Sequence, residues 1–314
     1  MPARHPRAEV ERLKRLSIEE RGGIVRIGDF VTPEDPGSAF DRLMGLVPDI
    51  LAGHDFRTAI SAVAGAARDG RGVLVMFGAH LIKCGLSRLL IDLMERGVVT
   101  AVATSGAGAI HDFEIAKWGM TSEDVATRIV DGSFGMCEET ADLLNAAATA
   151  GHREDLGLGE SVGRAVSDAP HVDASVLGAA FRLGVPATVH VGIGTDIIHQ
   201  HASADGAALG ATSLTDFRIL AEVVRRQSGG CVVNIGSAVV LPEVFLKALS
   251  VARNLGVDAQ ALTTISMDMN APYRVAANVI ARPTSESGMG IALRGRHELL
   301  FPLFWAGVVR LCGP

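Results

Sequence analysis

Short runs of β-branched and other apolar residues alternate along this chain with longer segments of helical periodicity. Such alternation limits the fold more than any other feature, because it is typical of a parallel sheet covered by helices on both faces. The predicted strands are residues 72–77, 98–104, 187–191, 231–235 and 261–267. The predicted helices are residues 56–68, 86–96, 122–149, 175–183, 215–227 and 241–255. We therefore predict an α/β fold of Rossmann-like type.

Length and composition favour one large domain. The chain has 314 residues, of which 48% are hydrophobic, and no shift in composition marks a second domain. We predict a charged N-terminal arm over residues 1–28 and a single α/β domain over 29–314. The Gly-rich, charged segment 151–170 is expected to form a long loop or a short helix pair near the crevice.

Charge and cysteine content exclude several classes of protein. The net charge of −6 and the 4% aromatic content argue against nucleic acid as a main partner. No apolar run approaches the roughly 20 residues of a membrane span, and the charged N-terminus lacks the apolar centre of a secretory signal. The four cysteines are far apart, without a Cys-x-x-Cys pair, so we expect reduced thiols and a cytoplasmic protein. No metal site is predicted.

Glycines, histidines and hydroxyl side chains gather just after the predicted strands. In an open parallel sheet, ligands bind beyond the carboxyl ends of the strands, where loops and helix N-termini supply free N–H donors. The turn 104–113 (TSGAGAIHDF) contains small residues that let the backbone approach a phosphate or ribose, although a plain tight turn explains it too. In the turn 192–201 (GIGTDIIHQH), Asp196 is expected either to accept hydrogen bonds from ribose hydroxyls or a substrate amine, or to cap the next helix.

Four residues are candidates for catalysis: Lys83, His111, Asp112 and His199. Lys83 follows a strand at the edge that should line the crevice, where partial burial would lower its pKa. Such a lysine either forms an imine with a carbonyl substrate or pairs with a pyrophosphate. A second hypothesis gathers His111, Asp112, His199 and His201 around a metal.

These strand-end segments, in this order, resemble the deoxyhypusine synthase family, which includes homospermidine synthases of plant type. The resemblance covers about residues 29–307 and lies in blocks, chiefly 72–114, 181–200, 231–268 and 299–309. It implies an NAD-dependent transferase that takes hydride from a polyamine and passes an aminobutyl group through a lysine imine. It also implies a homo-oligomer, a dimer or a tetramer.

The resemblance carries over to the cofactor region residue by residue. It implies NAD contacts at two loops, at a Thr-Asp pair, at the Gly-rich helix block and at the end of the following strand. These positions are Ala79, His80, Leu81, Ile82, Lys83, Thr104, Ser105, Gly106, Asp196, Gly236, Ser266, Met267 and Asp268.

Three departures separate this chain from that family. The region corresponding to the family's imine-forming lysine is 282–294, and no lysine follows Lys247. Ile110 and His111 replace the paired glutamates that would hold a polyamine, and Leu241 to Glu243 replace a histidine. Histidines or Lys83 would repel a dication. We therefore expect an NAD-dependent transferase of aminoalkyl or related groups on another small-molecule substrate. A non-catalytic nucleotide-binding or assembly protein and a metal-dependent hydrolase are the alternatives.

Overall fold

The computed structural model describes residues 8–256 and 259–313. Its centre is a sheet of six parallel strands in the order β5-β3-β2-β6-β7-β8. The strands are β2 (Val73–Phe77), β3 (Ala101–Ser105), β5 (Ala187–His190), β6 (Cys231–Ile235), β7 (Thr263–Asp268) and β8 (Met289–Arg294). The predicted α/β fold with a parallel sheet is confirmed.

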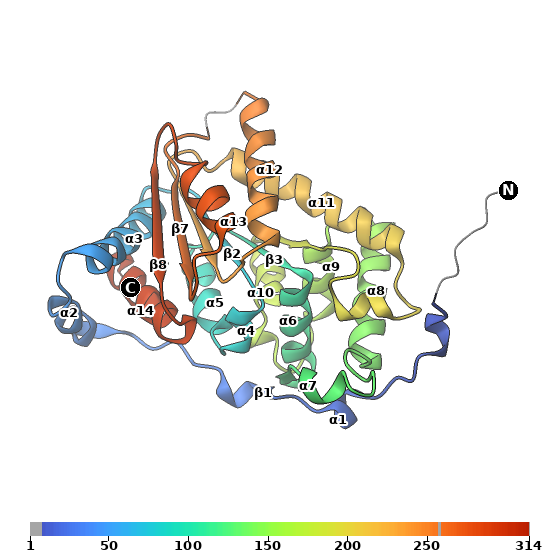
Figure 1. Ribbon diagram of the computed structural model, residues 1–314. Helices are drawn as coiled ribbons and strands as arrows, with labels where there is room; N and C mark the ends of the chain where they lie inside the picture. Colours follow the sequence, from blue (N-terminus) through green and yellow to red (C-terminus); the bar gives the residue numbers. More distant parts are fainter. Residues whose placement is uncertain (1–7, 257–258, 314) are drawn as a thin grey trace.

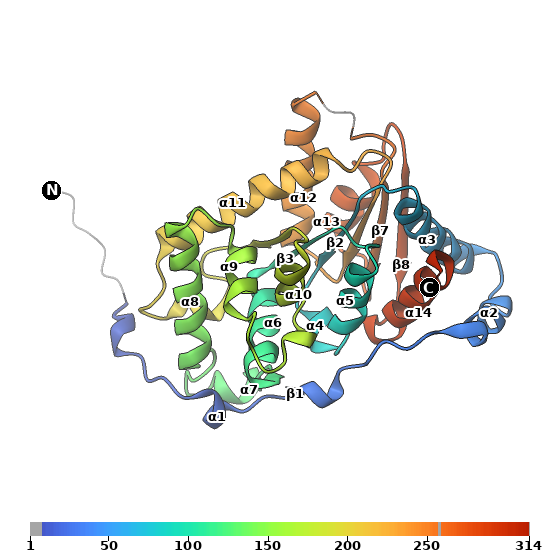
Figure 2. The same cartoon turned by 180° about the vertical axis from the view of Figure 1, so that it is seen from behind.

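Helices cover both faces of this sheet, as Figures 1 and 2 show from opposite sides. One face packs on α3 (Leu51–Arg68), α5 (Ser87–Glu95) and α14 (His297–Cys312), with Val75 and Phe77 pointing into this core. The other face packs on α11 (Gly206–Arg225) and α12 (Val240–Asn254), with Leu74 and Met76 pointing the opposite way. Strands buried on both faces explain why the sequence shows continuous apolar runs there.

A third core lies beyond the β5 edge of the sheet. It joins the helices α6 (Gly106–Trp118), α8 (Glu138–Arg153), α9 (Leu158–Ala165) and α10 (Val176–Leu183). The remaining helices are α1 (Ile18–Arg21), α2 (Gly37–Gly45), α4 (His80–Lys83), α7 (Val125–Arg128), α13 (Tyr273–Val275) and a π-helical turn at Ala276–Ala281. No helix of the described residues is long and apolar enough to cross a membrane.

The helix predicted over residues 122–149 is wrong for residues 122–137 and confirmed for 138–149. Residues 122–137 instead form a loop that contains the single turn α7, and α8 begins only at Glu138. Gly132 and Gly135 both have φ of +77°, a left-handed conformation that no continuous helix contains. The segment 151–170 contains the end of α8 and the helix α9 rather than a long loop.

The N-terminal segment packs against the body of the protein. The short strand β1 (Val25–Arg26) pairs antiparallel with β4 (Met120–Thr121), and Leu16 bridges to Cys137. Residues 1–7 of the predicted arm lie outside the described residues. In Figure 1 the described part runs below α6, α7 and α8, beside the loops that follow the strands.

Candidate functional site

The carboxyl ends of the six parallel strands lie along one edge of the sheet. The chain places β3 and β5 on one side of β2 and then places β6, β7 and β8 on the other side, so the direction of strand addition changes between β2 and β6. Such a switch point opens a crevice in sheets of this kind. Here the loops after the two strands touch, because a Cβ on Gly78 would lie 2.5 Å from the Gly236 carbonyl oxygen. Gly236 itself has φ of +65°. The predicted cofactor positions Ala79, His80 and Gly236 therefore lie together at the switch point.

Several other predicted cofactor positions have buried side chains. Ile82 and Met267 are fully buried, and Leu81, Ser266 and Asp268 are nearly so. The side chains of Leu81, Ile82 and Met267 pack into cores, so only their backbone groups are available to a ligand.

The predicted turn 104–113 is the end of β3 followed directly by the helix α6. Two of its glycines are required by close contacts. A Cβ on Gly106 would lie 2.0 Å from Asp196 Oδ2, and a Cβ on Gly108 would lie 2.0 Å from Thr104 Oγ1. Thr104 in turn donates a hydrogen bond to the Phe77 carbonyl at 2.9 Å. The two glycines thus let the side chains of Asp196 and Thr104 approach the first turn of α6.

Asp196 lies against the first turn of α6 with one oxygen unpartnered. Its side chain is 5% exposed, and burial raises the pKa of this carboxyl to about 6, although a backbone hydrogen bond from Ala107 opposes the shift. Its Oδ2 has no hydrogen-bond partner among the described residues. His199 Nε2 lies 3.9 Å from Oδ2 and is also buried and unpartnered. Two buried polar atoms without partners mark a place where a ligand can supply hydrogen bonds.

A cavity of about 270 Å³ opens beside Asp196, and we call it the Lys83 cavity. Its polar and charged lining residues come from α4, α6 and the loops around them. They are Arg21, Lys83, His111, Glu114, Ser122, Glu123, Thr195 and Asp196. Its apolar walls are Ala107, Ile110, Val125, Phe134 and Ile197. The structure therefore brings together Lys83, His111 and Asp196 of the predicted site.

Lys83 lies on the surface at this cavity. Its side chain is exposed, so the partial burial expected from the sequence is wrong. Lys83 nevertheless lines the cavity together with His111. Lys247 pairs with Glu243 on the surface of α12.

His111 is oriented by a chain of buried hydrogen bonds. Thr121 donates its hydroxyl proton to Glu114 Oε2 at 2.6 Å, so it can only accept at its other contact, which is His111 Nδ1 at 2.7 Å. His111 Nδ1 must therefore carry a proton, and Nε2 is left as the acceptor. Burial lowers the pKa of His111 to about 4, which keeps the ring neutral at pH 7.

Glu114 anchors this chain through a buried ion pair. Arg21 donates to both carboxylate oxygens, at 2.6 and 3.0 Å, and the two side chains are 2% and 1% exposed. Thr140 donates a further hydrogen bond to Oε1 at 2.8 Å. Every oxygen of Glu114 is thus paired, and the N-terminal segment contributes a residue to the wall of the cavity.

Ser122 and Glu123 were not predicted as site residues, because the sequence predicted a continuous helix through both. Ser122 has φ of +66°, a strained conformation for a residue with a side chain, and its buried hydroxyl has no partner among the described residues. Glu123 Oε1 accepts a hydrogen bond from Gly135 N–H at 3.1 Å. Its Oε2 is buried without a hydrogen bond, and Arg128 Nε lies 3.6 Å away. Burial raises the pKa of Glu123.

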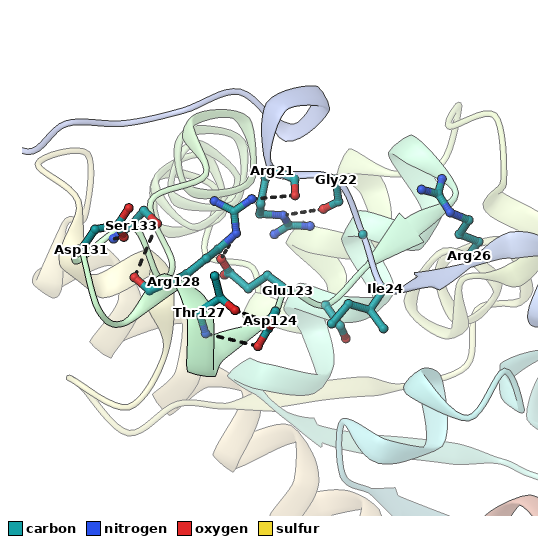
Figure 3. Close-up of a pocket in the computed structure, with 12 residues that line it drawn as sticks. Arg21, Gly22, Ile24, Arg26, Glu123, Asp124, Thr127, Arg128, Asp131 and Ser133 are labelled. Carbon is teal, nitrogen blue, oxygen red and sulfur yellow. Dashed lines mark hydrogen bonds and ion pairs between the residues drawn. The ribbon is translucent and has the colours of Figure 1, made fainter.

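Arg21, Ser122 and Glu123 also line a second, more open cavity of about 510 Å³. Figure 3 shows it between the N-terminal segment and the loop around α7. Arg128 crosses it, donating to the Arg21 carbonyl at 2.8 Å and approaching Glu123. Glu123 therefore lies between the two cavities.

Asp112 has a structural position and does not reach the Lys83 cavity. It is fully buried and accepts hydrogen bonds from Val176 N–H, Leu177 N–H and the Ser175 hydroxyl at 2.7, 3.1 and 2.6 Å. It caps the N-terminus of α10, a favourable place for a carboxylate. Burial still raises the pKa of Asp112 to about 6. Because no oxygen is free for substrate, we do not retain it as a catalytic candidate.

The hypothesis of a His/Asp metal site is not supported by the geometry. His201 Nε2 contacts the Gly135 carbonyl at 2.8 Å, and His199 Nδ1 accepts from the backbone N–H groups of Gly194 and Asp196. Asp112 is occupied at α10. Within the described part of the chain, these groups do not converge on one ion position.

Comparison with known proteins rests on structure alone. No family model and no curated protein sequence matches the chain. Among solved structures, a candidate deoxyhypusine synthase from Entamoeba histolytica is 11% identical and has a TM-score of 0.51. The match covers 88% of this chain and 96% of that protein. This chain has a deoxyhypusine synthase-like fold.

Two further neighbours are structures of AgrE. The binary complex of an AgrE mutant with L-arginine is 15% identical, with a TM-score of 0.53 over 84% of this chain. The ternary complex of AgrE with ornithine and NAD⁺ is also 15% identical, with a TM-score of 0.51 over 82% of this chain. The chain corresponds to only 34% of AgrE in both matches. At such identities these likenesses establish the deoxyhypusine synthase-like fold and no activity.

Proposed function

We propose that this protein binds NAD at the carboxyl edge of the sheet and acts as an NAD-dependent transferase of aminoalkyl or related groups. The observation that carries the proposal is the Lys83 cavity, where Glu123, whose buried Oε2 accepts no hydrogen bond, and the neutral ring of His111 line one volume next to Asp196. Arg128 Nε lies 3.6 Å from this oxygen, and an ammonium group would supply the hydrogen bond that it lacks.

The Lys83 cavity can accept a cationic substrate, because it contains the Glu123 carboxylate. The sequence suggested that histidine in place of glutamate would repel a cation, but His111 is uncharged at pH 7 because burial lowers its pKa to about 4. Phe134 and Val125 provide apolar wall for the methylene groups of an aminoalkyl chain. A substrate with an amine on a short aliphatic chain therefore suits this cavity.

The residues that would hold NAD are those at the strand ends. Asp196 fits a ribose hydroxyl, because its Oδ2 is buried and unpartnered beside the start of α6. The backbone at Ala79 to Lys83, at Thr104 to Gly106, at Gly236 and at Ser266 to Asp268 would form the remaining contacts. NAD, when bound, supplies a hydride acceptor for oxidation of the substrate.

The protein's own groups would position the substrate and accept a proton. Glu123 would bind the amine that is not oxidised, and His111, whose ring Thr121 holds through Nδ1, would accept a proton at Nε2 from the reacting amine. We assign Lys83 first to the pyrophosphate of NAD, since this exposed residue lines the cavity. Its alternative role is condensation with an aldehyde, which forms an imine and releases water.

The first experiment incubates the purified protein with NAD and a panel of diamines, polyamines and amino acids, and follows NADH by absorbance. We expect turnover with at least one amine, loss of that turnover in Glu123→Gln, and unchanged NAD affinity in this variant. Asp196→Asn should instead weaken NAD binding. Asp168→Asn, at an exposed residue paired with Lys117, is the control for removing a carboxylate.

The second experiment separates the two roles of Lys83 by borohydride trapping with aminoaldehydes. An adduct on Lys83 assigns the imine, whereas weakened NAD binding in Lys83→Met without any adduct assigns the pyrophosphate contact. Binding of NAD with no turnover on any amine would favour the non-catalytic nucleotide-binding alternative. We also expect a homo-oligomer, which sedimentation at micromolar concentration would test.

A further inference from the structure

Three potential metal ligands converge at the switch point, outside the Lys83 cavity. His80, Cys84 and Glu298 each offer one ligand atom, and these atoms all lie within 4.8 Å of one another. His80 and Cys84 are four residues apart, at the start of α4 and just after its end. Glu298 comes from the first turn of α14, a helix more than 200 residues later in the chain. The fold, rather than local sequence, therefore assembles this group.

The spacing suits a small divalent cation. Cys84 Sγ and Glu298 Oε2 are 3.8 Å apart. Zinc bonds of about 2.3 Å to sulfur and about 2.1 Å to oxygen place two tetrahedral ligands about 3.6 Å apart. The three ligand atoms lie within 4.8 Å of one another, so they must approach to about the tetrahedral separation to surround one ion. His80 and Glu298 are exposed, so the position is open to an ion from solvent.

His297 adds a second, independent observation at this position. Its ring lies edge-on to His80, with 5.5 Å between the ring centres, and it is 2% exposed. Its Nε2 contacts the Met267 carbonyl at 3.2 Å, whereas its Nδ1 is buried without a partner among the described residues. A buried histidine with an unsatisfied nitrogen thus packs against His80, one of the three potential ligands.

We propose that His80, Cys84 and Glu298 form a binding site for a zinc-type divalent cation whose fourth position is open to water or a ligand. A thiolate with an imidazole and a carboxylate selects Zn²⁺ or Co²⁺ over Mg²⁺ and Ca²⁺, which prefer oxygen ligands alone. On binding, the S–H bond of Cys84 breaks, the sulfur–metal bond forms and the proton leaves to solvent. The site lies outside the Lys83 cavity and is independent of the proposed amine chemistry.

The test uses the full chain, reduced, stripped with a chelator and free of NAD. Co²⁺ alone is added first, because a cobalt–thiolate bond gives a charge-transfer absorption band. We expect one Co²⁺ per chain and this band in the wild type and in Cys312→Ser, a control that removes another half-buried thiol of the described chain. The band should be absent in Cys84→Ser. Zn²⁺ should displace the Co²⁺.

Glu298→Gln is the second variant, since an exposed residue can be changed without loss of folding. We expect it to weaken Zn²⁺ binding at least about 10-fold while leaving the melting temperature of the metal-free protein unchanged. Substoichiometric Co²⁺ in the wild type would overturn the proposal. A charge-transfer band that persists in Cys84→Ser, or Zn²⁺ affinity of Glu298→Gln within about twofold of wild type, would overturn it as well. Because NAD is absent, none of these results bears on NAD binding.

Discussion

Breaking the Arg21–Glu114 pair should destabilise the whole protein. Both side chains are almost inaccessible to solvent, and Arg21→Met leaves the Glu114 carboxylate buried with only Thr121 and Thr140 as partners. Removing one member of a buried pair costs about 3–5 kcal/mol, because the remaining charge stays desolvated. An unfolding entropy of about 2.1 cal/mol/K per residue gives about 0.66 kcal/mol/K for 314 residues. The melting temperature should therefore fall by about 5–8 °C.

The assay is a double-mutant cycle measured by thermal and urea unfolding. The double variant Arg21→Met/Glu114→Gln removes both charges, and we expect it to recover at least about 2 kcal/mol relative to the sum of the single variants. Arg12→Met is the control, since its pair with Glu9 is exposed and should contribute under about 1 kcal/mol. A cost below about 1 kcal/mol for Arg21→Met, or strict additivity in the cycle, would refute the argument that this pair is buried and coupled.

Three further predictions concern single side chains around the site. Thr121→Val removes the hydrogen-bonded link between His111 and Glu114. It should cost about 2 kcal/mol of stability and lower turnover without changing the Kd of NAD. Turnover equal to that of the wild type would exclude a role for this link. Asp112→Ala removes the carboxylate that accepts from the N–H groups of Val176 and Leu177 and leaves the Ser175 side chain as the remaining cap of α10. It should cost about 2–3 kcal/mol in urea unfolding, whereas a loss of turnover in the folded variant would restore a catalytic role. Burial raises the pKa of Asp196 from 3.8 to about 6, so between these pH values the folded protein binds more protons than the unfolded chain. The contribution of Asp196 to stability therefore falls as the pH rises from about 4 to about 6. Asp196→Asn should remove that part of the slope between about pH 4 and 6, and an unchanged slope would contradict the assignment.

The central strands were predictable because burial on both faces leaves continuous apolar runs. The strand predicted at 231–235 has the observed bounds, and β2 differs by one residue. The edge strand β8 was missed because only Ile291 and Leu293 of its six residues are buried, so it lacks such a run. A strand with one neighbour and one exposed side has a weaker apolar pattern than a central strand.

The site residues that directly follow strand ends were predictable. Those whose position depends on contacts between distant parts of the chain were not. Lys83, His111 and Asp196 were found because the rule for parallel sheets points to these loops. Glu123 was missed because helical periodicity continues across a loop that two left-handed glycines interrupt. Asp112 was predicted to be catalytic because it is next to His111 in the sequence. The sequence around it does not indicate that it binds the start of α10, 63 residues later.

The likeness to deoxyhypusine synthase was visible in the order of sequence blocks, although sequence comparison alone finds no matching family. The structure supports the fold part of that resemblance and leaves the chemistry to experiment. Asp196 and Glu123 relate the fold to the proposed chemistry, because both line the Lys83 cavity and each has a buried oxygen without a hydrogen bond.

Binding of NAD tests the account most directly, and thermal unfolding with increasing NAD measures it. A ligand at about 100 times its Kd stabilises the folded state by about 2.7 kcal/mol, which corresponds to about 4 °C for a chain of this length. We predict a saturable rise of this size in the wild type and in Glu123→Gln, and a rise that requires more NAD in Asp196→Asn. A melting temperature that moves by less than about 1 °C at saturating millimolar NAD would contradict the assignment of the carboxyl edge as a dinucleotide site.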